Sequence, residues 1–574
     1  MNSTSATPTG NGYDLLVSRL DEWGITLYSG VTGGGVIHFL KHFPPFDADV
    51  DGRAALFTLG EYSAGFVPLG HYLASGKMAA AVATSGAATK LLTCGLSDAK
   101  LHDIPAVYLV PLSGAATEGL APLQDTTRHG SNVPEQLRAE CPDGVFLLDN
   151  ISTLASTLTQ ARRQLDNAKP VVLVLMHEAL VERVPASSPP LSPPEPAETD
   201  DIAVFLTQFR QAVSDKHLVI LVGEEMARYK QASQMTEQLC QVLHAKAIWS
   251  INGANAVSRS NPYGYGYISF GGNDSSLSLY ENLGENDVLM ILGACPDEYT
   301  ANLKKFSAAN TFYLSNIRGA YGQIDNSFSH FATGEYHHVH APLDSLLRSL
   351  TDEGRSEPFG NIPADIAPDY LNALPLTQPE AGYVNMAELY QRLDAWWPEN
   401  SLGFDDVCLA YKDRQYVTQR PNDRIRFFSL YRGSAMGGAF GAAIGARLAS
   451  PNSAVFVFTG DGCFRMFAGS MGEARDLGLT LFLLNNSRFS IVEQGLTQIL
   501  PDVDPRNYHA EVRPLDYCAL ARASGWQAER LAVDLSNLHS LLAKCRTPGS
   551  VSMLIEVLVD PAHVLGTNPR VKNL

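Results

Sequence analysis

Two apolar, strand-like segments each end in a polar turn motif, and one helix-length segment separates them. The first, residues 454–459, ends in Gly460-Asp461-Gly462, and the second, residues 481–484, ends in Asn485-Asn486. In a parallel strand–helix–strand unit, the carboxyl ends of both strands meet at one edge of the sheet. We therefore expect Asp461 and Asn486 to lie side by side, at the edge where open α/β sheets bind their ligands.

These residue types fit the anchoring of a bulky anion through a metal ion. The glycines permit a tight turn and a close approach of the main chain. Asp461 offers an anionic oxygen, the Asn486 side chain a neutral one, and the main-chain carbonyl near Arg488 a third. Magnesium takes few protein ligands and completes its octahedron with phosphate and water oxygens. Either motif alone is more often an ordinary turn, but together, after two apolar strands, they indicate a metal and diphosphate site.

The paired motifs resemble the signature of the thiamine diphosphate (ThDP) enzymes, and most closely the group of acetolactate synthase, benzoylformate decarboxylase and pyruvate decarboxylase. The resemblance covers nearly the whole chain. It implies that Asp461 and Asn486 bind Mg2+ through their side chains and Arg488 through its carbonyl. It also places Gly460, Gly462 and Cys463 beside the cofactor diphosphate.

Two further segments resemble the same family. Leu59-Gly60-Glu61, followed by Ala83-Thr84-Ser85-Gly86, is similar to the pyrimidine-binding segment, which implies a catalytic and cofactor-binding role for Glu61. Gly433-Ser434-Ala435-Met436-Gly437-Gly438 is similar to the glycine-rich turn that supports the bent cofactor, with Met436 between its two rings. Alternatively, Glu61 is a first-turn helix acid and Met436 a filler of the core.

The length of 574 residues exceeds what one hydrophobic core normally supports. Alternating apolar and amphipathic segments predict three Rossmann-like α/β domains with mostly parallel sheets. Their expected bounds are 1–184 (pyrimidine-binding), 202–350 (central) and 380–574 (diphosphate-binding), with a proline-rich linker at 185–201 and a second linker at 351–379. Residues 221–225 lack a full dinucleotide fingerprint, so bound flavin (FAD) is not expected, although the run does not exclude it.

The formal net charge of -18 argues against electrostatic binding to nucleic acid or to an anionic membrane. The eight cysteines show neither paired nor metal-ligand spacing. The first 13 residues lack a secretory pattern, and no apolar stretch has the length needed to cross a bilayer. A cytoplasmic enzyme acting on small molecules is therefore expected.

Departures from the family bear on the reaction. The region of Ala115 lacks both the histidine pair of pyruvate decarboxylases and a glutamine of acetolactate synthases, whereas Gln124 matches a second acetolactate synthase glutamine. A pocket tryptophan of that enzyme falls at Gly495, which predicts space for a larger or different acceptor. Glu493 is expected either in proton transfer or as an ordinary exposed helix residue.

The resemblance implies a ThDP- and Mg2+-dependent lyase or transferase. It would decarboxylate a 2-oxo acid, with pyruvate the expected donor, and pass the acyl carbanion to a second carbonyl compound, as an acetolactate synthase-like carboligase. The alternatives are a non-oxidative decarboxylase that releases an aldehyde, a peroxide- or flavin-coupled oxidase, and an inactive cofactor-binding subunit. Because Glu61 and Asp461 belong to different domains, a homodimer or homotetramer with sites at the subunit interface is expected.

Overall fold

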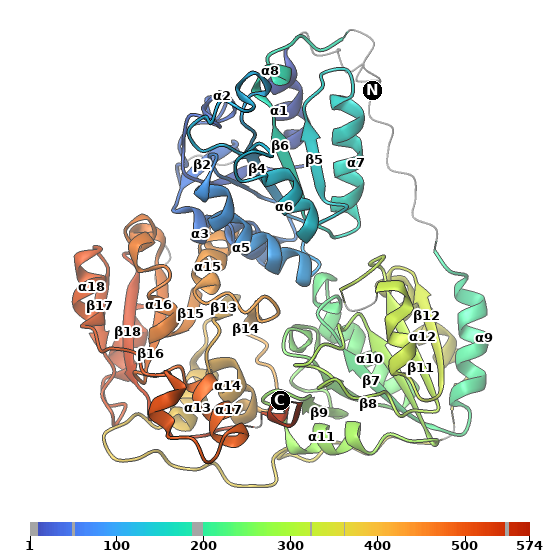
Figure 1. The fold of residues 1–574 in the computed structure, drawn as a ribbon. Coiled ribbons are helices and arrows are strands. Elements are labelled where there is room, and N and C mark those ends of the chain that lie inside the picture. Colours follow the sequence, from blue (N-terminus) through green and yellow to red (C-terminus); the bar gives the residue numbers. More distant parts are fainter. Residues whose placement is uncertain are drawn as a thin grey trace.

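The chain forms three α/β units, each built on one six-stranded sheet (Figure 1). The computed structural model describes residues 10–48, 52–185, 199–321, 324–360, 362–545, 550–566 and 568–573. Every ladder between named strands is parallel. The predicted fold class is confirmed, and the sheets are parallel throughout.

The first sheet, at the top of Figure 1, has the strand order β2-β1-β3-β4-β6-β5. Its strands are β1 (Leu27–Gly30), β2 (Ala55–Thr58), β3 (Ala80–Val82), β4 (Val107–Pro111), β5 (Val145–Leu148) and β6 (Val171–Leu175). Its helices are α1 (Gly12–Glu22), α2 (Ile37–Leu40), α3 (Glu61–Ala64), α4 (Val67–Ser75), α5 (Ala87–Leu101), α6 (Val133–Glu140), α7 (Leu154–Asp166) and α8 (His177–Leu180).

The second sheet has the order β12-β11-β10-β7-β8-β9. Its strands are β7 (His217–Val222), β8 (Ala245–Trp249), β9 (Gly264–Tyr267), β10 (Asp287–Leu292), β11 (Asn310–Ser315) and β12 (Glu335–His340). The helices are α9 (Ile202–Val213), α10 (Ala232–Leu243), α11 (Asp274–Glu281) and α12 (Leu343–Ser356). Strands such as β7 and β10 are almost continuously apolar because helices cover both faces of a parallel sheet.

The third sheet has the order β14-β13-β15-β16-β18-β17. Its strands are β13 (Ser401–Asp405), β14 (Ile425–Ser429), β15 (Val455–Gly460), β16 (Leu479–Asn485), β17 (Gln527–Arg530) and β18 (Met553–Leu558). Its helices are α13 (Met386–Trp396), α14 (Ala410–Thr418), α15 (Gly438–Ala449), α16 (Asp461–Phe464), α17 (Ser490–Ile499), α18 (Tyr517–Ala523) and α19 (Leu538–Lys544). The strand order reverses at β13, because β14 is added on one side of it and β15 on the other. A crevice is expected at that point.

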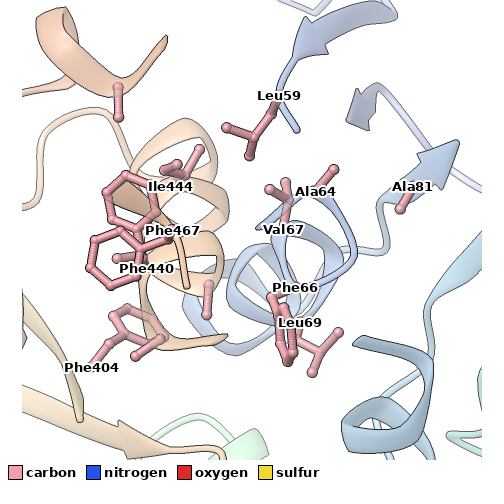
Figure 2. Close-up of a cluster of buried hydrophobic side chains, with 14 of the residues drawn as sticks. Leu59, Ala64, Phe66, Val67, Leu69, Ala81, Phe404, Phe440, Ile444 and Phe467 are labelled. Atoms are coloured by element: carbon pink, nitrogen blue, oxygen red, sulfur yellow. The ribbon is translucent and has the colours of Figure 1, made fainter. Parts of the chain in front are cut away.

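The first and third units share one hydrophobic core. Figure 2 shows Phe66 and Val67 of the first unit beside α15, whose Phe440 stacks on Phe467 on the other side of that helix with ring centroids 4.3 Å apart. Glycines bring the backbones of α4 and α15 together, since a Cβ at Gly70 would lie 1.7 Å from the carbonyl oxygen of Ala442. The two units are therefore packed closely on each other through helix faces that leave no room for an added methyl group.

Two segments differ from expectation. The segment between β15 and β16 is not one helix but the short α16 followed by 3-10 turns at Ala468–Ser470 and Gly472–Leu477. Glycines at 469 and 472 lower helix propensity there. Helix α12 continues into the predicted linker 351–379, and most of the linker 185–201 lies outside the described residues. The domain boundaries remain predictions.

In the described part of the chain, none of the helices combines the length and the apolar character needed to span a membrane. All eight cysteines are free thiols.

Candidate functional site

The two turn motifs lie side by side at the carboxyl edge of the third sheet. Strands β15 and β16 pair in register from Val455 opposite Leu479 to Gly460 opposite Leu484. Asp461 and Asn486 follow the two strand ends, and the main-chain N–H of Ser487 donates a hydrogen bond of 2.9 Å to Asp461 Oδ2. The expected neighbourhood of these two residues is therefore present.

Asp461 is a buried carboxylate that faces hydrogen-bond donors. Its side chain is 1 % exposed, and Oδ1 accepts a 3.1 Å hydrogen bond from the N–H of Gly462. Burial raises the pKa of Asp461 to about 6, while the N–H groups of Gly462 and Ser487 act in the opposite direction. A cation held against this carboxylate would favour its ionised form.

The oxygens around Asp461 fit a small hard cation. Asn486 Oδ1 accepts a 3.0 Å hydrogen bond from the N–H of Arg488, and Asn486 Nδ2 donates one of 2.6 Å to Ser490 Oγ. The amide is thereby oriented, and its oxygen keeps a second lone pair. Among the described residues, no group of three or more His, Cys, Asp or Glu side chains could hold a metal. A metal ion at Asp461 would therefore depend on amide, main-chain and phosphate oxygens, as Mg2+ does.

The two glycines of the first motif have different roles. A Cβ at Gly462 would lie 2.4 Å from ring atom Cε1 of Phe489, so a side chain there would force the Phe489 ring to shift. A Cβ at Gly460 would meet only the Cβ of Cys408, at an ordinary 3.4 Å. The next residue, Cys463, is buried, and its thiol donates to the carbonyl of Val407 at 3.2 Å. Gly462 thus fixes how closely α17 approaches the first motif.

A residue that the sequence analysis missed, Asp406, joins this motif to the Met436 turn. It follows β13 and is 2 % exposed. Its Oδ2 accepts a 2.8 Å hydrogen bond from Thr459 Oγ1 of β15, and its Oδ1 accepts one of 2.8 Å from the N–H of Gly437. Gly437 has a φ of 89°, in the left-handed region that favours glycine. The apolar run ending in Asp405-Asp406 was a usable signal, because it repeats the pattern of a strand followed by an acid.

Glu61 begins α3, directly after the edge strand β2, and is partly exposed. Its segment packs on the third unit of the same chain. A Cβ at Gly60 would lie 2.9 Å from Ser470 Oγ, and the hydroxyl of Tyr62 donates to the carbonyl of Met436. Tyr62 therefore connects the glutamate segment to the Met436 turn, a link with no signal in the sequence.

The other two predicted catalytic residues lie in different places. Gln124, on the loop after β4, has a φ of 59° and accepts a 3.2 Å hydrogen bond from Ser85 Oγ, so it belongs to the edge of the first sheet. Glu493 lies on α17 and pairs with Arg488 at 2.8 Å. Arg488 and Glu493 line a cavity of about 840 Å3 that also borders Leu277 of α11 and Val564.

Gly495, also on α17, is buried, yet a Cβ built on it would meet no atom within 4 Å. The described chain thus leaves open space around Gly495, the position where the sequence analysis expected room for a larger or different acceptor.

Comparisons with known proteins agree with this geometry. The family described as "Thiamine pyrophosphate enzyme, N-terminal TPP binding domain" matches residues 10–132, and "Thiamine pyrophosphate enzyme, C-terminal TPP binding domain" matches residues 412–557. The large subunit of acetolactate synthase isozyme 1 of Escherichia coli (strain K12) is 23% identical over 86% of this chain and 84% of its own. The acetolactate synthase large subunit of Lactococcus lactis subsp. lactis (strain IL1403) is 23% identical over 97% of this chain and 94% of its own.

A solved structure has the same fold. It is the thiamine diphosphate-dependent 4-hydroxybenzoylformate decarboxylase of Rhodococcus jostii RHA1, which superposes with a TM-score of 0.77 at 16% identity. The superposition covers 96% of this chain and 99% of the solved chain. At this identity the likeness shows the fold alone.

Proposed function

Because the chain belongs to the thiamine pyrophosphate enzymes, we propose that it uses ThDP and Mg2+ to decarboxylate a 2-oxo acid and transfer the acyl unit to a second carbonyl compound. The observation that carries the proposal is a pair of hydrogen-bonded groups at neighbouring strand ends: Ser487 donates to Asp461, and both Thr459 and Gly437 donate to Asp406. Together they join the predicted diphosphate motif to the turn predicted to support the cofactor rings. The acetolactate synthase relatives favour pyruvate as the donor.

In this proposal, the third unit holds the cofactor. Asp461 and Asn486 would bind Mg2+ through side-chain oxygens and Arg488 through its carbonyl, while Gly460, Gly462 and Cys463 lie beside the diphosphate. Met436 would support the bent conformation. When bound, the thiazolium ring supplies an electron sink for the carbanion left by loss of CO2.

The remaining residues would act on protons and on the substrate. The Glu61 carboxyl would exchange a hydrogen-bonded proton with a pyrimidine ring nitrogen, which is general acid–base work by a positioned carboxyl group. Gln124 would orient a polar group of the substrate. Glu493, oriented by Arg488 at 2.8 Å, would exchange a proton with the product. The open space at Gly495 supports a larger or different acceptor.

A homodimer or homotetramer is part of the proposal. Large apolar side chains lie exposed next to the predicted site residues: Leu123 is 94% exposed beside Gln124, and Val492 is 50% exposed beside Glu493. A second copy of the chain would cover them and complete the site. An active monomer in analytical ultracentrifugation would contradict this assembly.

The second candidate, a decarboxylase that releases an aldehyde, is supported by the activity named for the solved Rhodococcus jostii protein. The third candidate, an inactive subunit, is disfavoured by Glu61, because a purely structural cofactor site needs no acid there.

One incubation separates these candidates. The protein with ThDP, Mg2+ and pyruvate, with and without a panel of aldehyde and 2-oxo acid acceptors, is followed by proton NMR. Acetolactate or a mixed acyloin supports carboligation, whereas acetaldehyde alone supports the second candidate. If no 2-oxo acid in a wider donor panel is consumed, the proposed reaction is wrong.

A further inference from the structure

The turn that carries Met436 is held at both ends by buried carboxylates from different units. At its carboxyl end, the N–H of Gly437 donates to Asp406. At its amino end, the N–H of Gly433 donates a 2.7 Å hydrogen bond to Oδ1 of Asp98, in helix α5 of the first unit. Between them, the carbonyl of Met436 accepts from Tyr62. Residues 433–437 are thus fixed at three points.

The contact between Asp98 and Gly433 leaves no room for a side chain at position 433. A Cβ at position 433 would lie 2.4 Å from Asp98 Oδ1, so only glycine permits this approach. Asp98 Oδ2 is buried and has no hydrogen-bond partner among the described residues. A buried polar atom without a partner destabilises the fold and is rare. The buried Asp98 carboxylate therefore destabilises the fold through Oδ2. Its Oδ1 accepts the hydrogen bond from the main-chain N–H of Gly433 in the turn.

The residue that precedes the turn, Arg432, fixes it to the second unit. Its side chain is 3 % exposed, and its Nε donates to Asp297 Oδ2 at 2.6 Å while a terminal nitrogen contacts Glu224. A further terminal nitrogen donates to the carbonyl of Leu101, at the end of α5, at 3.0 Å. All three units thus meet at the start of this turn, and Arg432 also attracts the Asp98 carboxylate.

We propose that Asp98 is a positioning residue for the cofactor-supporting turn, whose carboxylate fixes the main chain before Met436 through the N–H of Gly433. This role rests on the proposed ThDP-dependent function. Asp98 itself touches neither substrate nor cofactor; it acts through Gly433.

The ionisation of Asp98 makes the role measurable. Burial raises its pKa to about 7, against the lowering effects of the Gly433 N–H and of Arg432. The carboxyl is therefore ionised above about pH 7 and gains a proton below it, which weakens both attractions. The titratable groups that face it are Arg432, Asp406, His102, Tyr62, Tyr108 and Cys94. His102 accepts a 3.3 Å hydrogen bond from the N–H of Arg432 through Nε2, which fits a neutral ring, and burial lowers its pKa.

The test is amide hydrogen exchange of the full-length protein without cofactor, followed on a peptide covering residues 431–437 and corrected for the intrinsic rate. Protection in the wild type should fall between pH 8 and pH 6. Asp98→Ala removes the acceptor and should reduce protection at pH 8 by about 10- to 150-fold, the range of a charge-assisted hydrogen bond. Asp98→Asn keeps an acceptor without a charge, so it should give intermediate protection that does not change from pH 6 to pH 8.

Ser97→Ala is the matched control, because Ser97 is the preceding residue of α5 and donates to Glu140, away from the turn. Protection in Asp98→Ala equal to that in Ser97→Ala would overturn the proposal. The proposal would also be overturned if protection in Asp98→Asn changed with pH as it does in the wild type. This second comparison remains decisive if Asp98→Ala does not fold. ThDP titrations separate the role of Asp98 from the proposed function. If neither the wild type nor any variant binds ThDP, the proposed function is refuted, whereas the hydrogen-exchange result on Asp98 still stands.

Discussion

Replacement of Gly462 by alanine should destabilise the third unit before any cofactor is bound. The added Cβ would lie 2.4 Å from Cε1 and 2.9 Å from Cδ1 of Phe489, well inside normal contact distance. Overpacking of this kind costs about 1–3 kcal/mol. For a cooperative unit of roughly 150–250 residues, that corresponds to a fall in melting temperature of about 2–12 °C.

The matched control is Gly460→Ala, two residues earlier in the same motif. Its Cβ would make only an ordinary contact of 3.4 Å, and Gly460 has a φ of -82°, which any residue adopts. Scanning calorimetry of both variants without ThDP and Mg2+ compares the two sites directly. We expect the Gly462→Ala transition to move down and the Gly460→Ala transition to stay within about 2 °C of the wild type, as for a surface-like change. Equal shifts in both variants would refute the steric argument.

Three further predictions follow from the same contacts. Glu61→Gln should abolish turnover, because the amide cannot exchange the proton, while binding of ThDP with Mg2+ stays measurable by calorimetric titration; unchanged turnover would rule out the proposed acid–base role. Gly441→Ala should lower the melting temperature of the apo-protein more than Gly462→Ala, since its Cβ would lie 2.1 Å from the rigid main-chain oxygen of Ser63; an unchanged melting temperature would contradict the close packing of α15 on the first unit. Tyr62→Phe should weaken ThDP binding roughly 2- to 10-fold by removing the hydrogen bond to Met436, with wild-type affinity the contrary result.

The strands and the strand-end motifs were predictable because they depend on local pattern. The apolar run 454–459 became β15 (Val455–Gly460), within one residue at each end, since a buried parallel strand is apolar along its whole length. The adjacency of Asp461 and Asn486 followed from the parallel strand–helix–strand arrangement, in which the carboxyl ends of both strands meet at one edge of the sheet. The segment between them was expected to form one helix. It forms α16 and short 3-10 turns instead, because its glycines disfavour a continuous helix.

The residues that join the units could not be read from the sequence. Asp98 and Gly433 are separated by 335 positions, and nothing in the local pattern of α5 distinguishes Asp98 from a solvated helix acid. Tyr62 and Met436 are 374 positions apart. Such pairs arise only when the first and third units pack through α4 and α15. Their roles depend on this tertiary contact, and no hydrophobic periodicity in the sequence indicates them.

The most direct test of the central claim is calorimetric titration of ThDP into the wild type and into Asp461→Asn, each with Mg2+ and with EDTA. If the Asp461–Asn486 edge anchors the diphosphate through a metal ion, the wild type binds ThDP only with Mg2+. Asp461→Asn, which lacks the anionic ligand, should then lose at least about tenfold in affinity, equivalent to about 1.4 kcal/mol. Binding in the wild type that is indifferent to Mg2+, or an unchanged affinity of Asp461→Asn, would contradict the account.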